Sequence, residues 1–280
     1  MTKADGERLQ ADISAGRTRA PVTAAGAKKR GRVRVTGGKA VAARATAAFR
    51  AMLAWAVDRK HVKANPLAGI RLNKIKGRER VLSDAELARL AEAAAAMEAE
   101  GVNAKGLTII RLLALTGARR NEIATLRRPY LEFDHGRARL PDSKTGERFV
   151  PLGGPALAIL SAWLERSADR GGYVFPAERG GGHYQGTPKV WRELRRRARL
   201  PGVRLHDLRH GFASLGVGLG QSLFVVGKAL GHRRAQTTER YAHLAADPVR
   251  VAADQVSRRV ADAMSGEKAP ADVVTIGRRR

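Results

Sequence analysis

The chain has 280 residues and carries 53 Lys plus Arg against 26 Asp plus Glu, which gives a formal net charge of +27. A charge of this size predicts that the protein binds a polyanion, and nucleic acid is the first candidate. The sequence has no cysteine, which excludes disulfides, Cys-ligated zinc and thiol catalysis. It has no uninterrupted apolar run of about 18 residues and no apolar signal core at its start, so we expect no membrane span and a cytoplasmic protein.

The positive charge is densest in the first 80 residues, which hold 20 basic against 5 acidic side chains. Its extreme is the segment 28–39, which has six basic side chains and no acidic one. One interpretation is a solvated, flexible loop, which the glycines of this segment favour. The other, which we favour, is an arm that contacts DNA phosphates. The candidate contacts are Lys28, Lys29, Arg30, Arg32 and Arg34.

Good helix formers and apolar residues at helical spacing predict a helix over residues 40–61. Asn65-Pro66 ends this segment, because the residue before a proline is driven out of the helical region. Residues 5–15 are a second, shorter candidate helix, and residues 67–80 are expected to be a linker. The apolar face of the long helix is predicted to consist of Phe49, Met52, Leu53, Ala56 and Val57.

We therefore predict three parts. Residues 1–75 form a short, basic, helical region. Residues 76–264 form the main domain, and residues 265–280 form a basic tail, which we expect to be disordered.

The main domain is predicted to be mostly helical. Ser83 and Glu86 form a capping-box pattern that opens a helix through residue 97. Residues 107–116 are apolar on nearly all sides and predict a buried helix that Gly117 ends. Further helices are expected over 121–128, closed by Pro129, then 156–167, 187–199 with Thr187 as N-cap, 205–217, 222–230, 237–245 and 249–264.

One segment has the alternation of strands. Residues 137–140 and 148–152 read as a β-hairpin with Lys144 in its turn. The predicted fold class is thus mainly α with a small antiparallel β-sheet.

Three motifs carry candidate chemistry, and the first is TGARRNEI at 116–123. Arg119 follows a helix-ending glycine and stands at the mouth of the next helix, where its planar fork can meet a phosphate. Glu122 is placed to brace it. Taken alone, an arginine in such a turn is more often an ordinary surface residue.

The second motif is LHDLRHGFAS at 205–214, in which His206, Arg209 and His210 share one helix face. One interpretation is a zinc pair of His206 and His210, although no third ligand is evident. Another is a phosphate clamp, with arginine as the fork and histidine as a hydrogen-bond partner. A third is a helix that merely packs on its leucines and Phe212.

The third motif is ALGHRRAQTTERYAHL at 229–244. His232 follows Gly231 at a predicted helix end, and Tyr241 comes nine residues later on a new helix. A helical tyrosine is usually an amphipathic filler. The alternative, which the polar neighbours of Tyr241 favour, is an exposed tyrosine whose hydroxyl takes part in the chemistry.

Taken together, these motifs resemble the tyrosine recombinases, or phage integrases. That family has an Arg in a TGxRxxE turn, a Lys on a hairpin, an HxxR helix, a His in an LGH turn and a Tyr about nine residues on. The resemblance covers residues 80–245 and implies a tyrosine-recombinase type of catalytic domain. The matching residues, in order, are Arg119, Lys144, His206, Arg209, His232 and Tyr241.

The resemblance implies a site-specific DNA recombinase that integrates or excises a phage-like element. Tyr241 would attack a phosphodiester to give a 3′-phosphotyrosine and a free 5′ hydroxyl. Arg119, Arg209 and His232 would stabilise the charged phosphate oxygens. Lys144 would protonate the leaving oxygen, and His206 would assist proton removal or bind the phosphate. No metal and no cofactor is required.

The implied partners are double-stranded DNA sites, further copies in a homotetramer, and accessory DNA-bending or directionality proteins. The resemblance implies that residues 1–75 are a partial, truncated core-DNA-binding region, because only about 75 residues precede the main domain, whereas the family usually has a bundle of about four helices there. The alternative function is therefore a truncated, catalytically impaired DNA-binding remnant.

Overall fold

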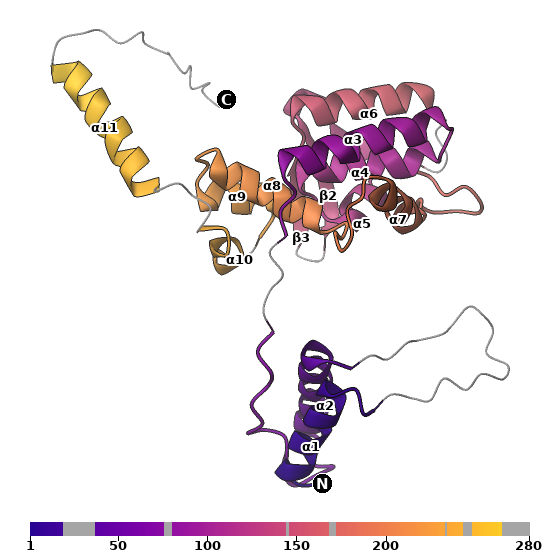
Figure 1. Ribbon diagram of the computed structural model, residues 1–280, viewed down its shortest axis with the longest axis vertical. Coiled ribbons are helices and arrows are strands. Elements are labelled where there is room, and N and C mark those ends of the chain that lie inside the picture. The colour runs from indigo at the N-terminus through magenta and orange to yellow at the C-terminus, as the bar shows by residue number, and fades with distance from the viewer. Residues whose placement is uncertain are drawn as a thin grey trace. The chain divides into compact units, whose positions relative to one another are not determined.

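The computed structural model describes residues 1–18, 37–75, 80–143, 146–167, 172–232, 234–242 and 248–264. They belong to two compact units, Met1–Arg78 and Glu79–Arg280, which we describe separately (Figure 1). Several predicted features lie outside the described residues, namely Lys28, Lys29, Arg30, Arg32, Arg34, Lys144 and the tail 265–280.

The first unit is built on two helices, α1 (Lys3–Ser14) and α2 (Lys39–Asp58), which pack against each other. Thr2 and Asp5 cap α1 reciprocally, which satisfies two backbone N–H groups at its start. The face of α2 that is buried most begins nearer the N-terminus than predicted, at Ala42, Ala43 and Thr46. Met52, which we had placed on that face, is 53% exposed.

The segment after α2 is not simply the linker that its composition predicts. Leu67 and Ile70 are buried, and both side chains lie where a Cβ on Gly6 of α1 would have to go. The small residue in α1 therefore admits this segment, because any larger side chain would displace it. Leu67 and Ile70 belong to the core of the first unit rather than to a linker.

By length and a mean hydropathy of 1.2, α2 also meets the criterion for a membrane-spanning helix. Its sequence includes Arg44 and Arg50, and an arginine in the middle of a bilayer costs about 3 kcal/mol. The helix packs against α1. We therefore interpret α2 as part of the first unit's helical packing and not as a membrane-spanning helix.

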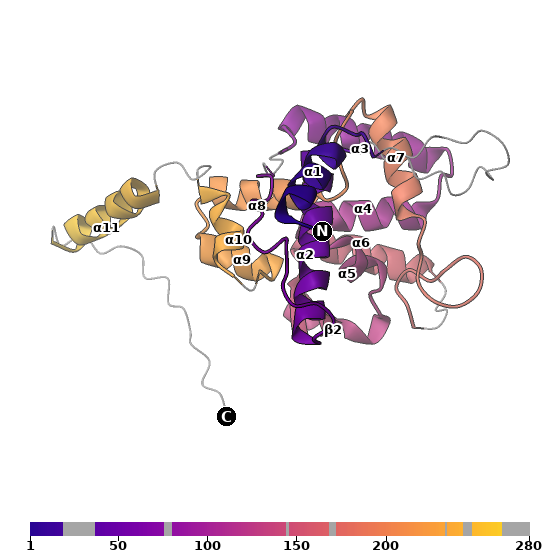
Figure 2. The ribbon, with the colours of Figure 1, turned by 90° about the horizontal axis from the view of Figure 1, so that it is seen from below.

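The second unit is mainly helical with one small sheet, as predicted (Figure 2). Ser83 caps its first helix with the capping box expected from the sequence. Its helices are α3 (Asp84–Ala99), α4 (Ala104–Thr116), α5 (Arg120–Ala124), α6 (Gly154–Arg166), α7 (Thr187–Arg197), α8 (Asp207–Gly218), α9 (Leu223–Leu230), α10 (Gln236–Glu239) and α11 (Pro248–Met264).

Helix α4 is the centre of the second unit. It packs against α3, α6, α7 and α8, and eight of its thirteen residues are buried. Gly106 lets Val190 of α7 approach the α4 backbone closely. The buried apolar side chains of α4 stabilise the unit because their surface is removed from water. Because α4 ends in the middle of the unit, the turn after it lies among other elements.

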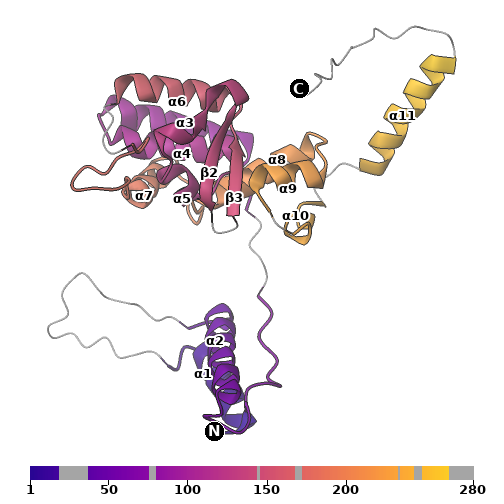
Figure 3. The ribbon, with the colours of Figure 1, turned by 180° about the vertical axis from the view of Figure 1, so that it is seen from behind.

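The sheet has three antiparallel strands in the order β1 (Leu131–Glu132), β2 (Arg137–Ser143) and β3 (Gly146–Pro151). Figure 3 shows β2 and β3 side by side. The hairpin of β2 and β3 was predicted, whereas the short β1 was not. In β3 the side chains alternate, with Arg148 and Val150 buried and Phe149 exposed. Strand β3 also contacts α9. Because side chains alternate along the strand, Arg148 of β3 points inward, toward the helices.

Three predicted boundaries were wrong. Helix α5 ends at Ala124, so Pro129 lies in a later 3-10 turn instead of closing the helix. Gly186, not Thr187, is the N-cap residue of α7. Helix α10 has four residues, so Tyr241 lies just after it and not within a longer helix.

Candidate functional site

The turn between α4 and α5 presents Arg119. Gly117 ends α4 in the left-handed conformation, with φ of 60°. The Thr116 hydroxyl donates to the Leu112 carbonyl at 2.6 Å and accepts the Ala118 N–H at 3.2 Å. These bonds satisfy backbone groups that a helix end leaves free. The turn is thus rigid, and the chain enters α5 with Arg119 as the N-cap residue.

Glu122 braces Arg119 from the first turn of α5. Its carboxylate accepts the Arg119 backbone N–H at 2.8 Å and the Nη1 N–H at 2.7 Å. The Glu122 side chain is 10% exposed and that of Arg119 is 43% exposed. The pair is therefore anchored on its acidic side and open to solvent on its basic side. A guanidinium fixed in this way can offer N–H donors to an anion such as a phosphate.

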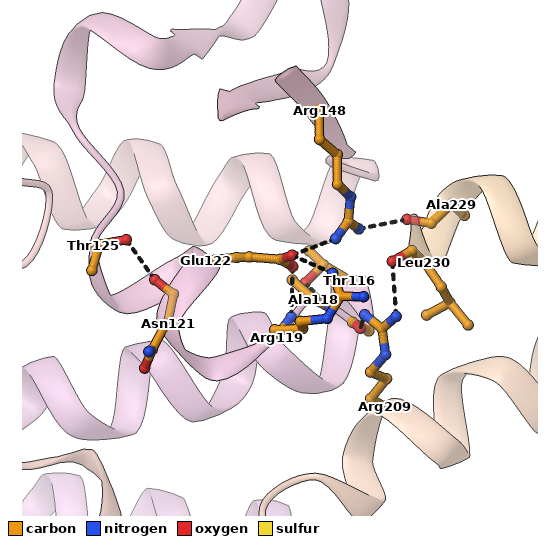
Figure 4. Close-up of polar contacts among 11 residues, drawn as sticks. Thr116, Ala118, Arg119, Asn121, Glu122, Thr125, Arg148, Arg209, Ala229 and Leu230 are labelled. Atoms are coloured by element: carbon orange, nitrogen blue, oxygen red, sulfur yellow. Dashed lines mark hydrogen bonds and ion pairs between the residues drawn. The ribbon is translucent and has the colours of Figure 1, made fainter. Parts of the chain in front are cut away.

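Arg148 of β3 joins the same carboxylate from the opposite side (Figure 4). Its Nη1 donates to Glu122 Oε1, and its Nη2 donates to the Ala229 carbonyl of α9 at 3.2 Å. The Arg148 side chain is only 7% exposed, and this burial lowers its pKa although Glu122 opposes the shift. Arg148 therefore ties the sheet to α5 and to α9.

Arg209 of α8 is buried and is held by two helix ends. Its Nη1 donates to the Gly117 carbonyl after α4, and its Nη2 donates to the Leu230 carbonyl of α9, both at 2.8 Å. Burial, together with the positive charges of Arg119 and Arg148, lowers the pKa of Arg209 to about 10. Arg209 is thus still charged near pH 7, and its guanidinium lies near that of Arg119 (Figure 4).

Two glycines make this convergence possible. Gly117 and Gly231 both have positive φ, which other residues adopt only with strain. A Cβ on Gly117 would lie 2.7 Å from side-chain atoms of Leu230 and Phe212, and a Cβ on Gly231 would lie 2.2 Å from Arg148 Nε. A side chain at position 117 would therefore displace Leu230 and Phe212, and one at position 231 would displace Arg148.

His232 follows the second of these glycines. Its Nδ1 is hydrogen-bonded to the Thr238 hydroxyl at 2.9 Å. Burial lowers the pKa of His232 to about 4, and the positive charges of Arg209 and Arg119 act in the same direction. The ring is therefore neutral near pH 7. A neutral imidazole carries one N–H donor and adds no further charge to the arginines.

This shift has a consequence for stability. The folded state disfavours protonation of His232, whereas an unfolded histidine takes up its proton near the ordinary pKa of 6.5. The stabilisation is thus complete above pH 6.5 and is lost as pH falls toward 4. We expect urea unfolding to show a smaller loss of stability over this interval for His232→Gln than for the wild type. Parallel curves for the two proteins would contradict the assignment.

Tyr241 lies in a small second core, with its ring 6% exposed among Ala213, Val217, Val226 and Leu230. Its hydroxyl is hydrogen-bonded to Nδ1 of His210 on α8. A buried phenol normally requires such a partner. The packing therefore fixes the ring, and the bond fixes the position of the oxygen.

His206 stands at the N-cap position of α8, and its exposed ring meets that of His210 edge to face, with centroids 5.1 Å apart. Partial burial and the charge of Arg209 lower its pKa. Five of the six predicted catalytic positions thus lie within the second unit, around the ends of α4, α8 and α9. They are Arg119, His206, Arg209, His232 and Tyr241.

Sequence reasoning missed two residues of this site. Arg148 is on the predicted hairpin, and its inward direction follows from strand alternation once the register is known. His210 was noted only as a zinc candidate with His206. Its contact with Tyr241 joins positions 31 residues apart, so no local spacing indicates it.

The zinc interpretation finds no support in the described residues, because they contain no group of three or more His, Asp or Glu side chains that could hold a metal. The arrangement instead combines two fixed guanidinium groups, a neutral imidazole and a hydrogen-bonded phenol. Such a set can neutralise a phosphodiester and offer it an oxygen nucleophile.

Comparison with known proteins identifies relatives of this chain. The model of the phage integrase family matches residues 80–247. Tyrosine recombinase XerC of Xanthomonas axonopodis pv. citri is 30% identical over 205 residues, which are 72% of this chain and 66% of XerC. Tyrosine recombinase XerA of Pyrococcus furiosus is 29% identical over 153 residues, 53% of this chain and 54% of XerA. The chain therefore spans less than two thirds of these relatives.

Among solved structures, a lambda integrase tetramer bound to a Holliday junction is similar with a TM-score of 0.59. The sequences are 19% identical, and the match covers 84% of this chain and 65% of the lambda protein. At this identity the likeness concerns the fold.

Proposed function

This chain belongs to the phage integrase family of tyrosine recombinases, and from that premise we propose that it is a site-specific DNA recombinase with Tyr241 as its nucleophile. The observation that carries the proposal is the convergence of Arg119 and Arg209 beside the ends of α4 and α9. Both guanidinium groups are positioned by bonds that do not involve a substrate. Such preorganised charge is what a phosphoryl-transfer site requires.

In the proposed reaction the Tyr241 oxygen attacks phosphorus, and the bond from phosphorus to the 5′ oxygen breaks. The products are a 3′-phosphotyrosine and a free 5′ hydroxyl. Arg119, Arg209 and the N–H of His232 stabilise the negative charge that develops on the phosphate oxygens. Lys144 protonates the leaving oxygen. Attack by a different 5′ hydroxyl reverses the step and exchanges strands without an energy source.

We assign the recombinase to the integration or excision of a phage-like element in the cytoplasm, with accessory DNA-bending or directionality proteins as partners. The proposal is tested by incubating the protein, in EDTA, with nicked duplexes tiled across the DNA that flanks its gene. A band shifted on a denaturing gel with wild type, and absent with Tyr241→Phe, is expected. DNA binding without any covalent product would instead identify a DNA-binding remnant.

We further propose that the protein assembles on DNA as a homotetramer. On α11, Val256, Val260 and Met264 recur every four residues and are all exposed. An apolar stripe of this kind favours burial against another surface, and we assign it to a second copy. Val260→Asp is expected to lower the stoichiometry on DNA in native mass spectrometry while Arg258→Asp, between these positions, leaves it unchanged. Equal stoichiometry for both variants would contradict this.

The basic segment 28–39 is proposed to contact DNA phosphates. The logarithm of the DNA-binding constant falls linearly with the logarithm of salt concentration, and each phosphate contact adds about 0.9 to the steepness of this fall. An alanine variant at Lys28, Lys29, Arg30, Arg32 and Arg34 is therefore expected to have a slope less steep by up to about 4.5. Exchanging Lys for Arg and Arg for Lys at the same five positions conserves the charge and is the control. A salt titration that gives the wild-type slope for the alanine variant would refute the contact.

A further inference from the structure

The hydroxyl of the proposed nucleophile contacts a residue outside the six predicted positions. The hydroxyl of Tyr241 is hydrogen-bonded to Nδ1 of His210, and their ring centroids are 6.0 Å apart. Both side chains are restrained. Tyr241 is packed in the second core, and His210 is half-buried on α8, next to the buried Arg209.

We propose that His210 is the proton acceptor for Tyr241 during strand cleavage. The proposal deepens, and rests on, the recombinase function given above. As the Tyr241 oxygen bonds to phosphorus, its O–H bond breaks and the proton passes to Nδ1 of His210. The bond from phosphorus to the 5′ oxygen breaks, and that oxygen takes a proton from the acid on the leaving side, Lys144. Rejoining returns each proton to its source.

The geometry meets the first requirement for a general base, which is direct hydrogen-bond contact with the proton that it takes. An ordinary phenol has a pKa near ~10 and is almost wholly protonated at pH 7. Arginines that neutralise the phosphate do not by themselves remove that proton. His210 supplies the missing acceptor, and His206, which is more exposed, is then available to bind the phosphate.

The charge state of His210 is also suitable. Burial lowers its pKa, and so do His206, Arg240 and Arg204, whereas Asp207 raises it. The imidazole is therefore neutral near pH 7. In the tautomer protonated at Nε2, its Nδ1 lone pair points to the phenol and can take the proton. In the cleaved state the proton held on Nδ1 is available for the reverse step.

A role in proton transfer and a merely structural role predict different results for two variants. His210→Ala removes both the hydrogen bond and the base. His210→Asn keeps an acceptor oxygen of similar reach, which can hold the phenol but cannot take a full proton. If His210 only positions Tyr241, the asparagine variant restores cleavage. If His210 is the base, both variants are slow.

The test is single-turnover cleavage of a nicked suicide duplex by the full chain, with DNA affinity and thermal unfolding measured in parallel. We expect both variants to cleave about 10²–10⁴-fold more slowly than the wild type, which is the usual contribution of a general base. The control is His135→Ala, at an exposed histidine outside the site. It is expected to cleave at the wild-type rate.

The pH profile gives an independent readout. The wild-type rate should fall on the acid side as His210 is protonated and should level off near neutral pH. In both variants the rate should instead rise about tenfold per pH unit between about pH 7 and 9, because the ionised fraction of a free phenol rises in this way. Added imidazole should partly restore His210→Ala.

The outcomes separate the two proposals. If the wild type forms no covalent product, the recombinase function fails and this inference falls with it. If the wild type cleaves and His210→Asn cleaves at the same rate with the same pH profile, only the inference about His210 is overturned. Slow cleavage by both variants with a rising pH profile supports both proposals.

Discussion

Replacing Arg209 with lysine is expected to slow DNA strand cleavage by about 10²–10³-fold, the usual effect of removing one preorganised donor from a site of developing negative charge. Arg209 uses separate nitrogens for the Gly117 and Leu230 carbonyls. A lysine carries one compact ammonium group and cannot reproduce this fork while also binding a phosphate. The loss should therefore appear in the cleavage rate even at saturating DNA.

The measurement is single-turnover cleavage over a range of DNA concentrations, together with the affinity for uncleaved DNA. Arg179→Lys is the matched control, because Arg179 is an exposed arginine of the same unit. It should behave as the wild type. If Arg209→Lys cleaves at the wild-type rate, Arg209 does not bind the phosphate in the way proposed.

The largest expected effect on folding is that of Arg148→Met. Removing one partner of a buried ion pair typically costs about 3–5 kcal/mol, because the other charge remains buried. Glu122 keeps its bonds to Arg119, so we expect a value near the lower end. The variant should also cleave DNA more slowly, since the carboxylate that positions Arg119 loses its second anchor.

Urea unfolding measures the stability, and the same hairpin provides the control. Arg139→Met removes a side chain that is 44% exposed and makes surface ion pairs, so its effect should stay within about 0.5 kcal/mol. The double variant Arg148→Met/Glu122→Gln should be less destabilised than the sum of the single variants, because it leaves no buried charge unpaired. Equal effects of Arg148→Met and Arg139→Met would contradict the buried pair.

Local patterns predicted much of the main domain. The capping box at Ser83 fixes the start of α3, and the largely apolar stretch that Gly117 ends fixes the end of α4, because helix capping and helix burial depend on neighbouring residues. The N-terminal helices also lie where they were predicted. The two-residue strand β1 was missed, since its pairing partner and not its sequence makes it a strand.

The site could be predicted only as a set of residues. Arg209 binds the carbonyls of residues 92 and 21 positions away, and no spacing within the LHDLRH motif encodes those partners. The same holds for Arg148 and Ala229, which are 81 positions apart. Motifs therefore indicated which side chains matter, whereas the fold determines what positions them.

Mass spectrometry tests directly whether Tyr241 becomes covalently attached to DNA. The sample is the adduct that the wild-type protein forms with a nicked duplex, after digestion with nuclease and protease. We expect one modified peptide, with a nucleotide joined through its 3′ phosphate to the phenol of Tyr241. An adduct on any other residue, or an unmodified Tyr241 peptide from protein that has cleaved DNA, would contradict this expectation.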